Sequence, residues 1–460
     1  MSGSNQIARV LRATIVAFRA GWLFLRRAWN ALKPAQQLTL GFLSYVFLGV
    51  LLLSWPVAQL RPVTMLDNLF NVTSAMSTTG LTTVSVSDHY SFLGQLVLVL
   101  LFQLGGIGYM TVSSFVLLAR GRALSEARLG VLRSEFSLPE GLDIRTFVRH
   151  VVLFTLAIEG VGSWLLYQEF VSAGIDRPLW SAVFHSVSAF ATAGFSLYSD
   201  SLEGFRGNGV VCTTIGLLAY LGAIGFIVIQ DAWQAVWSRR YRITFTSQVI
   251  LVMTAAVLAI GAPLLFFTDA SLQNLPLRER VYAAAFQVMT ASSTAGFNTV
   301  PISAMSASSL VLITIAMIIG ASPSGTGGGI KTTTLSSLLA VLVSTACGRQ
   351  RIAFWNHEIP ISRIFTATAA ATMYLICLSV GVFLLCLVER QPFLSIVFEA
   401  ASALGTVGLS LGITGDLTDA GKLLVTLLMF FGRVGPLTIG LALFHRKIVV
   451  TANRTADLAV

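Results

Sequence analysis

The chain has 460 residues, of which 55% are hydrophobic and only 11% are charged. A soluble domain carries about 25% charged residues, so the charge is too sparse to cover a water-facing surface. The net charge of +10 could suggest a nucleic-acid partner. However, the basic residues cluster in loops between apolar segments, as in the cytoplasmic loops of membrane proteins. The composition therefore predicts an all-α integral membrane protein that lies in the lipid bilayer and does not bind nucleic acid.

Residues 1–33 are predicted to form an amphipathic interfacial helix. Leu11, Ile15, Phe18 and Trp22 recur at steps of four and three, which places them on one helical face. Arginines flank this face, so the helix is expected to lie in the inner headgroup layer. The N-terminus is then cytoplasmic.

A motif of 12 residues occurs four times without gaps. The copies read FNVTSAMSTTGL, FHSVSAFATAGF, FQVMTASSTAGF and FEAASALGTVGL, beginning at Phe70, Phe184, Phe286 and Phe398. Each copy lies between two long apolar segments, and its helical part is shorter than the ~20 residues that span a bilayer. Each motif is therefore predicted to be a re-entrant pore helix followed by a loop.

The predicted fold has four tandem repeats, each a helix, a pore loop and a second helix, around one pore. This arrangement has eight spanning helices and four re-entrant helices. The first helices are predicted at about 38–58, 146–169, 248–267 and 364–388, and the second helices at about 92–119, 209–237, 310–345 (interrupted) and 422–445. The boundaries are 34–122 for repeat A, 123–240 for repeat B, 241–349 for repeat C and 350–450 for repeat D. Residues 451–460 form a cytoplasmic tail.

The glycine near the end of each motif predicts a cation filter. Rings of backbone carbonyls can replace the hydration shell of an ion, and glycine lets a loop aim its carbonyls inward without a Cβ clash. Four copies in phase favour this interpretation over ordinary tight turns. The candidate ligands, mainly through backbone carbonyls, are Thr78, Thr79, Gly80, Thr192, Ala193, Gly194, Thr294, Ala295, Gly296, Thr406, Val407 and Gly408.

Residues 320–330 interrupt the second helix of repeat C and are the candidate gate. Ile319–Thr334 reads IGASPSGTGGGIKTTT, and an interior glycine costs a helix about 1 kcal/mol and a proline about 3 kcal/mol. Because we expect this break in one repeat only, we interpret it as a gate below the filter. A simple kink is an alternative, and so is a phosphate-binding loop, although Ile330 replaces the glycine which that motif requires. The gate candidates are Gly320, Ser322, Pro323, Gly325, Gly327, Gly328, Gly329, Lys331 and Arg433.

Arg433 lies inside the last apolar segment, where a charge is expensive and suggests a function. Facing the pore, it would repel cations and stabilise a closed gate. An ion pair with Glu399 or Glu159 is the structural alternative. A polar residue also follows the first Phe of each motif, and hydrogen-bonded packing suits these positions better than cation attraction. They are Asn71, His185, Gln287 and Glu399.

Two other classes of function are alternatives to a channel. A secondary transporter, coupled to sodium or protons, is built from repeats with its site at broken helices. Four repeats in one orientation favour a pore over inverted halves. The sequence contains no HExxH motif and no catalytic carboxylate pair, so we expect that the protein is not an enzyme.

The four motifs, each with its glycine, resemble the membrane subunit of the Ktr/Trk/HKT superfamily of potassium transporters across residues 34–450. That family has one filter glycine per repeat, and serine in place of the first goes with sodium selectivity. Gly80 occupies that place here, so the resemblance implies potassium as the transported ion, with sodium as a second possibility. The family also has a loop in repeat C, matching residues 320–330, and a basic residue matching Arg433.

The resemblance also implies partners and location. The single N-terminal segment, in place of the extra helical hairpin of Trk-type subunits, favours the Ktr type. A homodimer is implied, together with a cytosolic ring of nucleotide-binding regulatory subunits. We expect no cytosolic domain within this sequence, since its longest loop, at about 119–145, is too short to fold independently. The protein is expected to be a multi-pass protein of the cell membrane with both termini in the cytoplasm.

Overall fold

The computed structural model describes residues 34–120, 143–237, 242–355 and 357–444, together with Leu32, Leu124, Leu129 and Leu132. Apart from Leu32, the amphipathic helix predicted at 1–33 lies outside the described residues, as does the tail 451–460. The described part is helical except for turns, loops and one short antiparallel pair of strands. These strands are β1 (Ala353–Phe354) and β2 (His357–Glu358).

A long helix, a re-entrant helix and a broken helix follow one another four times along the chain. The first set is α2 (Pro34–Leu53), α3 (Met65–Met76), and α5 (Phe92–Ile107) with α6 (Tyr109–Ala119). The second is α8 (Ile144–Ser172), α9 (Pro178–Phe190), and α10 (Gly209–Ala223) with α11 (Phe226–Trp237). The third is α12 (Phe245–Thr268), α14 (Leu277–Ser292), and α15 (Ala307–Ile318) with α16 (Thr332–Ala346). The fourth is α17 (Ile361–Val388), α18 (Phe393–Gly405), and α19 (Asp419–Val434) with α20 (Pro436–Phe444). Short helical turns between these are α4 (Val86–His89), α13 (Ala270–Gln273), η1 (Pro56–Ala58), η2 (Glu203–Phe205), η3 (Ile302–Ala304) and η4 (Thr414–Asp416).

The long helix that opens each set is apolar and lies close to its predicted position. Within the described residues, α2, α8, α12 and α17 are each long and apolar enough to cross a membrane. The first of them ends at Leu53 rather than near residue 58. The reason is Pro56, which disfavours helical backbone at the residue before it and begins the turn η1.

The second helix is broken in every repeat, so the prediction of a break in repeat C alone is wrong. The chain bends by 92° between α5 and α6 and by 99° between α10 and α11. Gly108, Gly225 and Gly435 stand at the breaks of repeats A, B and D with φ of 88°, 90° and 88°. A right-handed helix cannot contain this backbone conformation, which glycine adopts readily. Counting each bent pair as one span, the described residues hold up to six helices of spanning length.

At the N-terminus of each broken helix, a polar side chain caps the first turn. Ser91, Asn208, Ser306 and Thr418 are the N-cap residues, and each accepts a hydrogen bond from a backbone N–H of that turn. Carboxylates at or near the end of the preceding long helix bind three of these caps, through Glu169 on Asn208, Asp269 on Ser306 and Glu389 on Thr418. A negative charge at a helix N-terminus is favourable, so these contacts fix where each broken helix begins.

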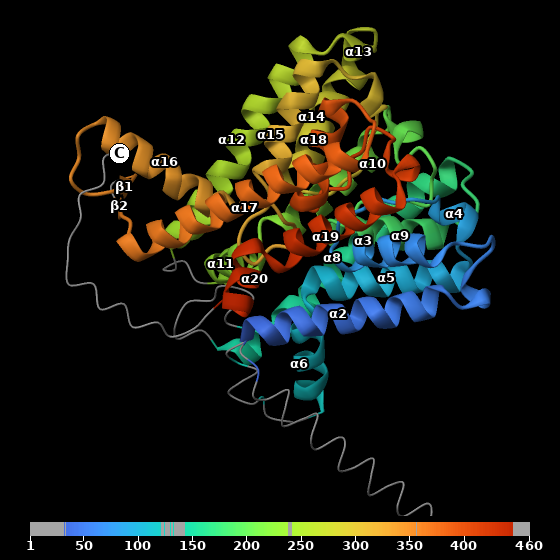
Figure 1. Ribbon diagram of the computed structural model, residues 1–460, viewed down its shortest axis with the longest axis horizontal. Coiled ribbons are helices and arrows are strands. Elements are labelled where there is room, and N and C mark those ends of the chain that lie inside the picture. The colour runs from blue at the N-terminus through green and yellow to red at the C-terminus, as the bar shows by residue number, and fades with distance from the viewer. Residues whose placement is uncertain are drawn as a thin grey trace, which may run out of the picture.

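The bundle closes on itself because the fourth repeat packs against the first. Figure 1 shows α19 beside α3, whereas α16 and the β1–β2 pair project from the bundle. Lys422 of α19 donates to Asp67 of α3 at 2.8 Å, and their side chains are only 14% and 11% exposed. Asp67 lies in the first turn of a re-entrant helix, outside the spanning helices. Burial raises the pKa of its carboxyl, but hydrogen bonds from Lys422 and Thr64 outweigh this and hold the pKa below its ordinary value.

We expect Lys422→Met to destabilise the detergent-solubilised protein by about 3–5 kcal/mol, because it leaves the buried Asp67 carboxylate without its partner. The double variant Asp67→Leu, Lys422→Met should recover most of this loss. Thermal unfolding measures both variants. Because the folded pKa of Asp67 is lowered, the contribution of the pair is present above the ordinary Asp pKa and is lost as pH falls through the folded value.

The matched control is Arg351→Met. Arg351 pairs with Glu358 at 3.1 Å, but the two side chains are 79% and 59% exposed. An exposed pair of this kind contributes little to stability. Equal losses for the two variants would show that the Lys422–Asp67 pair does not hold the first and fourth repeats together.

Candidate functional site

Each re-entrant helix ends in the same backbone turn, with a threonine in the left-handed conformation. Thr78, Thr192, Thr294 and Thr406 have φ of 55°, 51°, 59° and 50°. In every copy the threonine N–H donates to the alanine three residues back, and the next N–H donates to the Ser or Thr five residues back. This is the hydrogen-bond pattern of a Schellman motif, in which glycine is the usual left-handed residue. A β-branched residue in its place stores strain of about 1–3 kcal/mol, which is typical of functional sites.

The four motif glycines meet in a closed ring. A Cβ added to Gly80 would lie closer than 3.0 Å to the carbonyl oxygen of Ala193, and the same holds for Gly194 and Ala295. The ring continues from Gly296 to the Val407 carbonyl and closes from Gly408 to the Thr79 carbonyl. All four glycines have positive φ. Backbone from four distant parts of the sequence therefore converges on one axis, with no space for a side chain at these positions.

The polar residue after the first Phe of each motif braces the loop that carries the glycine. Asn71 accepts from the N–H of Thr83, and His185 Nε2 lies 2.9 Å from Ser196 Oγ. Glu399 accepts from Ser410 at 2.9 Å and also from Thr414. Gln287 donates at 3.5 Å to Thr299. These four residues are at most 1% exposed, so their hydrogen bonds support the packing interpretation over attraction of cations.

The loop of repeat C, residues 319–331, lies between α15 and α16 and is pinned along its length by backbone hydrogen bonds. At its base, Gly320 donates to Ile330 at 3.1 Å and Ala321 donates to Gly328 at 3.0 Å. Along one side it pairs with the break of repeat B. There Ser322 donates to Ala223, Thr326 donates to Gly222, and Phe226 donates to Ser324 at 3.0, 3.0 and 3.2 Å. The segment is therefore an ordered loop with its own partners rather than a simple kink.

Residues 326–328 of this loop fill the space that the four left-handed threonines enclose. The Thr326 carbonyl accepts from Thr78 at 3.2 Å, and its hydroxyl lies 3.0 Å from that of Thr192. A Cβ on Gly327 would collide with Thr294 Oγ1, and one on Gly328 would collide with Thr406 Oγ1. The loop therefore contacts all four repeats directly next to the glycine ring, and glycine at 327 and 328 permits this approach.

Two cationic side chains hold the loop in this position. Arg433 donates to the carbonyls of Thr326 and Gly105, and it lies 3.4 Å from Thr78 Oγ1. Lys331 Nζ donates to the Gly327 carbonyl at 2.6 Å. Since Glu399 binds Ser410 and Thr414, and Glu159 binds Gln103 at 2.9 Å, the described contacts of Arg433 favour the loop over the alternative ion pairs.

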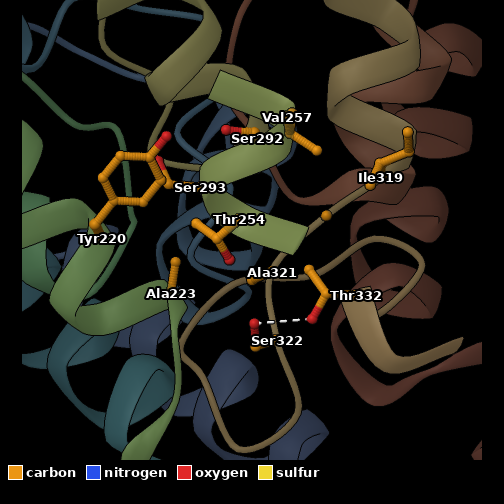
Figure 2. Close-up of a pocket in the computed structure, with 11 residues that line it drawn as sticks. Tyr220, Ala223, Thr254, Val257, Ser292, Ser293, Ile319, Ala321, Ser322 and Thr332 are labelled. Atoms are coloured by element: carbon orange, nitrogen blue, oxygen red, sulfur yellow. Dashed lines mark hydrogen bonds between the residues drawn. The ribbon is translucent and has the colours of Figure 1, made fainter. Parts of the chain in front are cut away.

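A small cavity lies beside the base of the loop. Figure 2 shows Tyr220 of α10, Thr254 of α12 and Ser292 of α14 around it, with Ser322 hydrogen bonded to Thr332 at 3.0 Å. Its volume is about 10 Å³, which is close to the space that one water molecule requires. The loop is thus close-packed at residues 326–328 but has some free space at its base.

Two features of this region were not predicted from the sequence. One is the left-handed threonine, because threonine rarely adopts this conformation. The alignment of Thr with the end of each helical segment was visible, but it carries no conformational signal by itself. The other is the break in repeats A, B and D, for which the aligned glycines at 108, 225 and 435 were a usable signal.

Comparison with known proteins gives a consistent assignment. Residues 13–448 match the family model TrkH, described as a cation transport protein. The chain is 33% identical over 417 residues to "Ktr system potassium uptake protein B" of Bacillus subtilis, covering 89% of this chain and 93% of that protein. It is 32% identical over 442 residues to "Potassium/sodium uptake protein NtpJ" of Enterococcus hirae, covering 93% and 96%. The crystal structure of the potassium transporter TrkH from Vibrio parahaemolyticus has the same fold, with a TM-score of 0.66 at 20% identity over 92% of this chain and 85% of that one.

We expect Gly408→Ala to lower the stability of the purified protein by at least about 1–2 kcal/mol, because its φ of 94° is strained for alanine and its Cβ would meet the Thr79 carbonyl. Thermal unfolding in detergent measures this loss. Gly160→Ala on α8 is the control, since among the described residues no atom beyond its chain neighbours and its own helix backbone lies within 4 Å of its added Cβ. Replacing an interior helical glycine by alanine stabilises the folded protein by about 0.5–1 kcal/mol, so the two variants should change the stability in opposite directions. An unchanged stability of Gly408→Ala would refute the close approach.

Proposed function

Because this chain belongs to the TrkH family of cation transport proteins, as residues 13–448 show, we propose that it takes up potassium through a pore along the axis of its glycine ring. The carbonyls next to the ring select the ion, and the loop of residues 319–331 together with Arg433 forms the gate. The protein is a multi-pass membrane protein and not an enzyme. Relatives at 31–33% identity carry the printed name of potassium uptake proteins, which supports potassium as the ion.

The closed ring of glycine and carbonyl contacts is the observation that carries the filter proposal. Four loops converge on one axis through identical backbone turns, and strained threonines hold each turn. A pore that dehydrates a cation must replace its water with oxygens at matched distances, and a fourfold arrangement of equivalent carbonyls supplies these. The negative ends of four re-entrant helix dipoles also point toward this axis, which favours a cation there.

The gate proposal rests on the position of the loop. The loop fills the space inside the threonine ring, so an ion leaving the filter meets Thr326, Gly327 and Gly328. Arg433 adds positive charge at the same point, and both Arg433 and Lys331 donate to loop carbonyls. A cation would face both a steric barrier and an electrostatic one, and opening requires the loop to leave its partners.

Sodium remains the second candidate ion, because one relative is named a potassium/sodium uptake protein. A secondary transporter coupled to sodium or protons is the second candidate mechanism, since broken helices meet near the axis. We further propose that the chain forms a homodimer in the cell membrane with both termini in the cytoplasm. A cytosolic ring of nucleotide-binding subunits would control the loop.

Gly408→Ser tests the filter. In proteoliposomes that contain the purified protein, we expect potassium flux to fall at least about tenfold, since a loss of 1.4 kcal/mol in ion binding already has this effect, and sodium to compete better than in the wild type. Gly160→Ser, on an open face of α8, is the matched control and should leave both quantities unchanged. Normal potassium selectivity in Gly408→Ser would place the ion path elsewhere.

Lys331→Met tests the gate. Met leaves the buried Gly327 carbonyl without this hydrogen bond, which costs about 1–3 kcal/mol, so the closed state should weaken by a factor of about 5 or more. Potassium flux of the isolated membrane protein should rise accordingly. Arg363→Met, at an exposed position near the start of α17, removes a charge away from the loop and should not raise flux. Unchanged flux in Lys331→Met would mean that this contact does not hold the gate shut.

A further inference from the structure

The C-terminal ends of α5 in repeat A and α10 in repeat B contact Arg433 and the gate loop. The last turn of α5 presents the carbonyls of Gly105 and Gly106, and Arg433 Nη2 donates to both, the second at 3.4 Å. The last turn of α10 presents the carbonyls of Gly222 and Ala223, which accept from the loop. The last four carbonyls of a helix lack partners within it, and at membrane depth each must be satisfied by protein or water.

The contacts of the Arg433 guanidinium include the oxygen types that coordinate potassium. Its described contacts are three backbone carbonyls and one threonine hydroxyl, from Gly105, Gly106, Thr326 and Thr78. The end of a helix carries about half a negative charge, and both α5 and α3 end here. This corner of the pore is therefore organised to hold a dehydrated positive charge.

Two unpartnered hydroxyls point to the same conclusion. Within the part of the chain that the structure describes, Thr294 Oγ1 and Thr406 Oγ1 have no hydrogen-bond partner, and both residues are fully buried. They face Gly327 and Gly328 of the loop, which have no side chain to bind them. A buried hydroxyl without a partner costs about 1–3 kcal/mol, so the closed loop leaves acceptors unused that a cation would engage.

We infer that the guanidinium of Arg433 occupies an inner cation site, and that a permeating monovalent cation binds there when Arg433 and the loop withdraw. The Gly105 and Gly106 carbonyls and the Thr78 hydroxyl are its ligands. The Thr294 and Thr406 hydroxyls lie on the other side of the loop, beside Gly327 and Gly328. This inference rests on the proposed pore and adds a site below the filter. The ion and the arginine exchange at the same oxygens, so potassium competes with the closed gate and shifts the population toward the open state.

Arg433→Ala empties the site and allows a direct test. The purified variant is kept in choline chloride and titrated with millimolar guanidinium, at constant ionic strength, while its thermal unfolding midpoint is recorded. Guanidinium should raise the midpoint of Arg433→Ala and leave the wild type unchanged. Potassium at about ten times its own Kd should raise the apparent Kd of guanidinium about tenfold, as expected for competition at one site. Arg433→Lys, which keeps a cation in place, should respond weakly to guanidinium.

Several outcomes decide the matter. Guanidinium stabilisation that is absent, or that potassium does not oppose, overturns the inner site. Arg363→Ala, which removes an exposed arginine of α17, should show no guanidinium effect, and an equal effect there also overturns the site. If Arg433→Ala does not fold, Arg433→Gln takes its place in the same titrations.

The double variant Arg433→Ala, Gly408→Ser separates this inference from the proposed filter. Competition between guanidinium and potassium should persist in it, because the inner oxygens belong to α5 and Thr78 rather than to the Gly408 loop. Loss of the competition would mean that the potassium effect arises in the filter and would overturn the inner site. Failure of the filter proposal has a different signature, namely unchanged ion selectivity in Gly408→Ser alone.

Discussion

Hydrogen bonding of backbone groups at membrane depth is the constraint on which the interior of this protein depends. Lipid offers no partner to a free carbonyl or N–H, yet the chain ends four re-entrant helices and breaks four others inside the bundle. The re-entrant helices satisfy their last carbonyls through a turn with a left-handed threonine. The breaks of repeats A and B use Arg433 and the loop of repeat C.

This shared use of partners connects structure to function. The loop and Arg433 are placed where helix ends require hydrogen-bond donors, so this arrangement, the closed state of the proposed gate, satisfies the backbone that it covers. Leaving that state exposes carbonyls that water or a cation must then satisfy. In the proposed mechanism, the stability of the closed gate and the affinity of the open pore for ions therefore depend on the same oxygen atoms, at Gly105, Gly106, Gly222 and Ala223.

Some features of the interior occur in all four repeats, and others occur in one repeat only. The glycine ring, the threonine turns and the polar braces occur in all four repeats, as a selective ring of equivalent ligands requires. At the position aligned with Gly106 and Ala223, repeat D has Arg433, and repeat C inserts its loop at the corresponding break. Small residues in repeats A and B leave the space into which the side chain of repeat D and the loop of repeat C fit.

The sequence by itself determined the membrane class, the four motifs, the long helices and the glycines that form the ring, because apolar length and an in-phase repeat are local signals. It also indicated the loop and Arg433 as exceptions among the repeats. Only the tertiary structure decided that Thr78 and its three equivalents are left-handed, that Gly108, Gly225 and Gly435 break their helices, and which carbonyls Arg433 binds. These depend on backbone groups that are distant in sequence and meet at one axis, and no local pattern records such meetings.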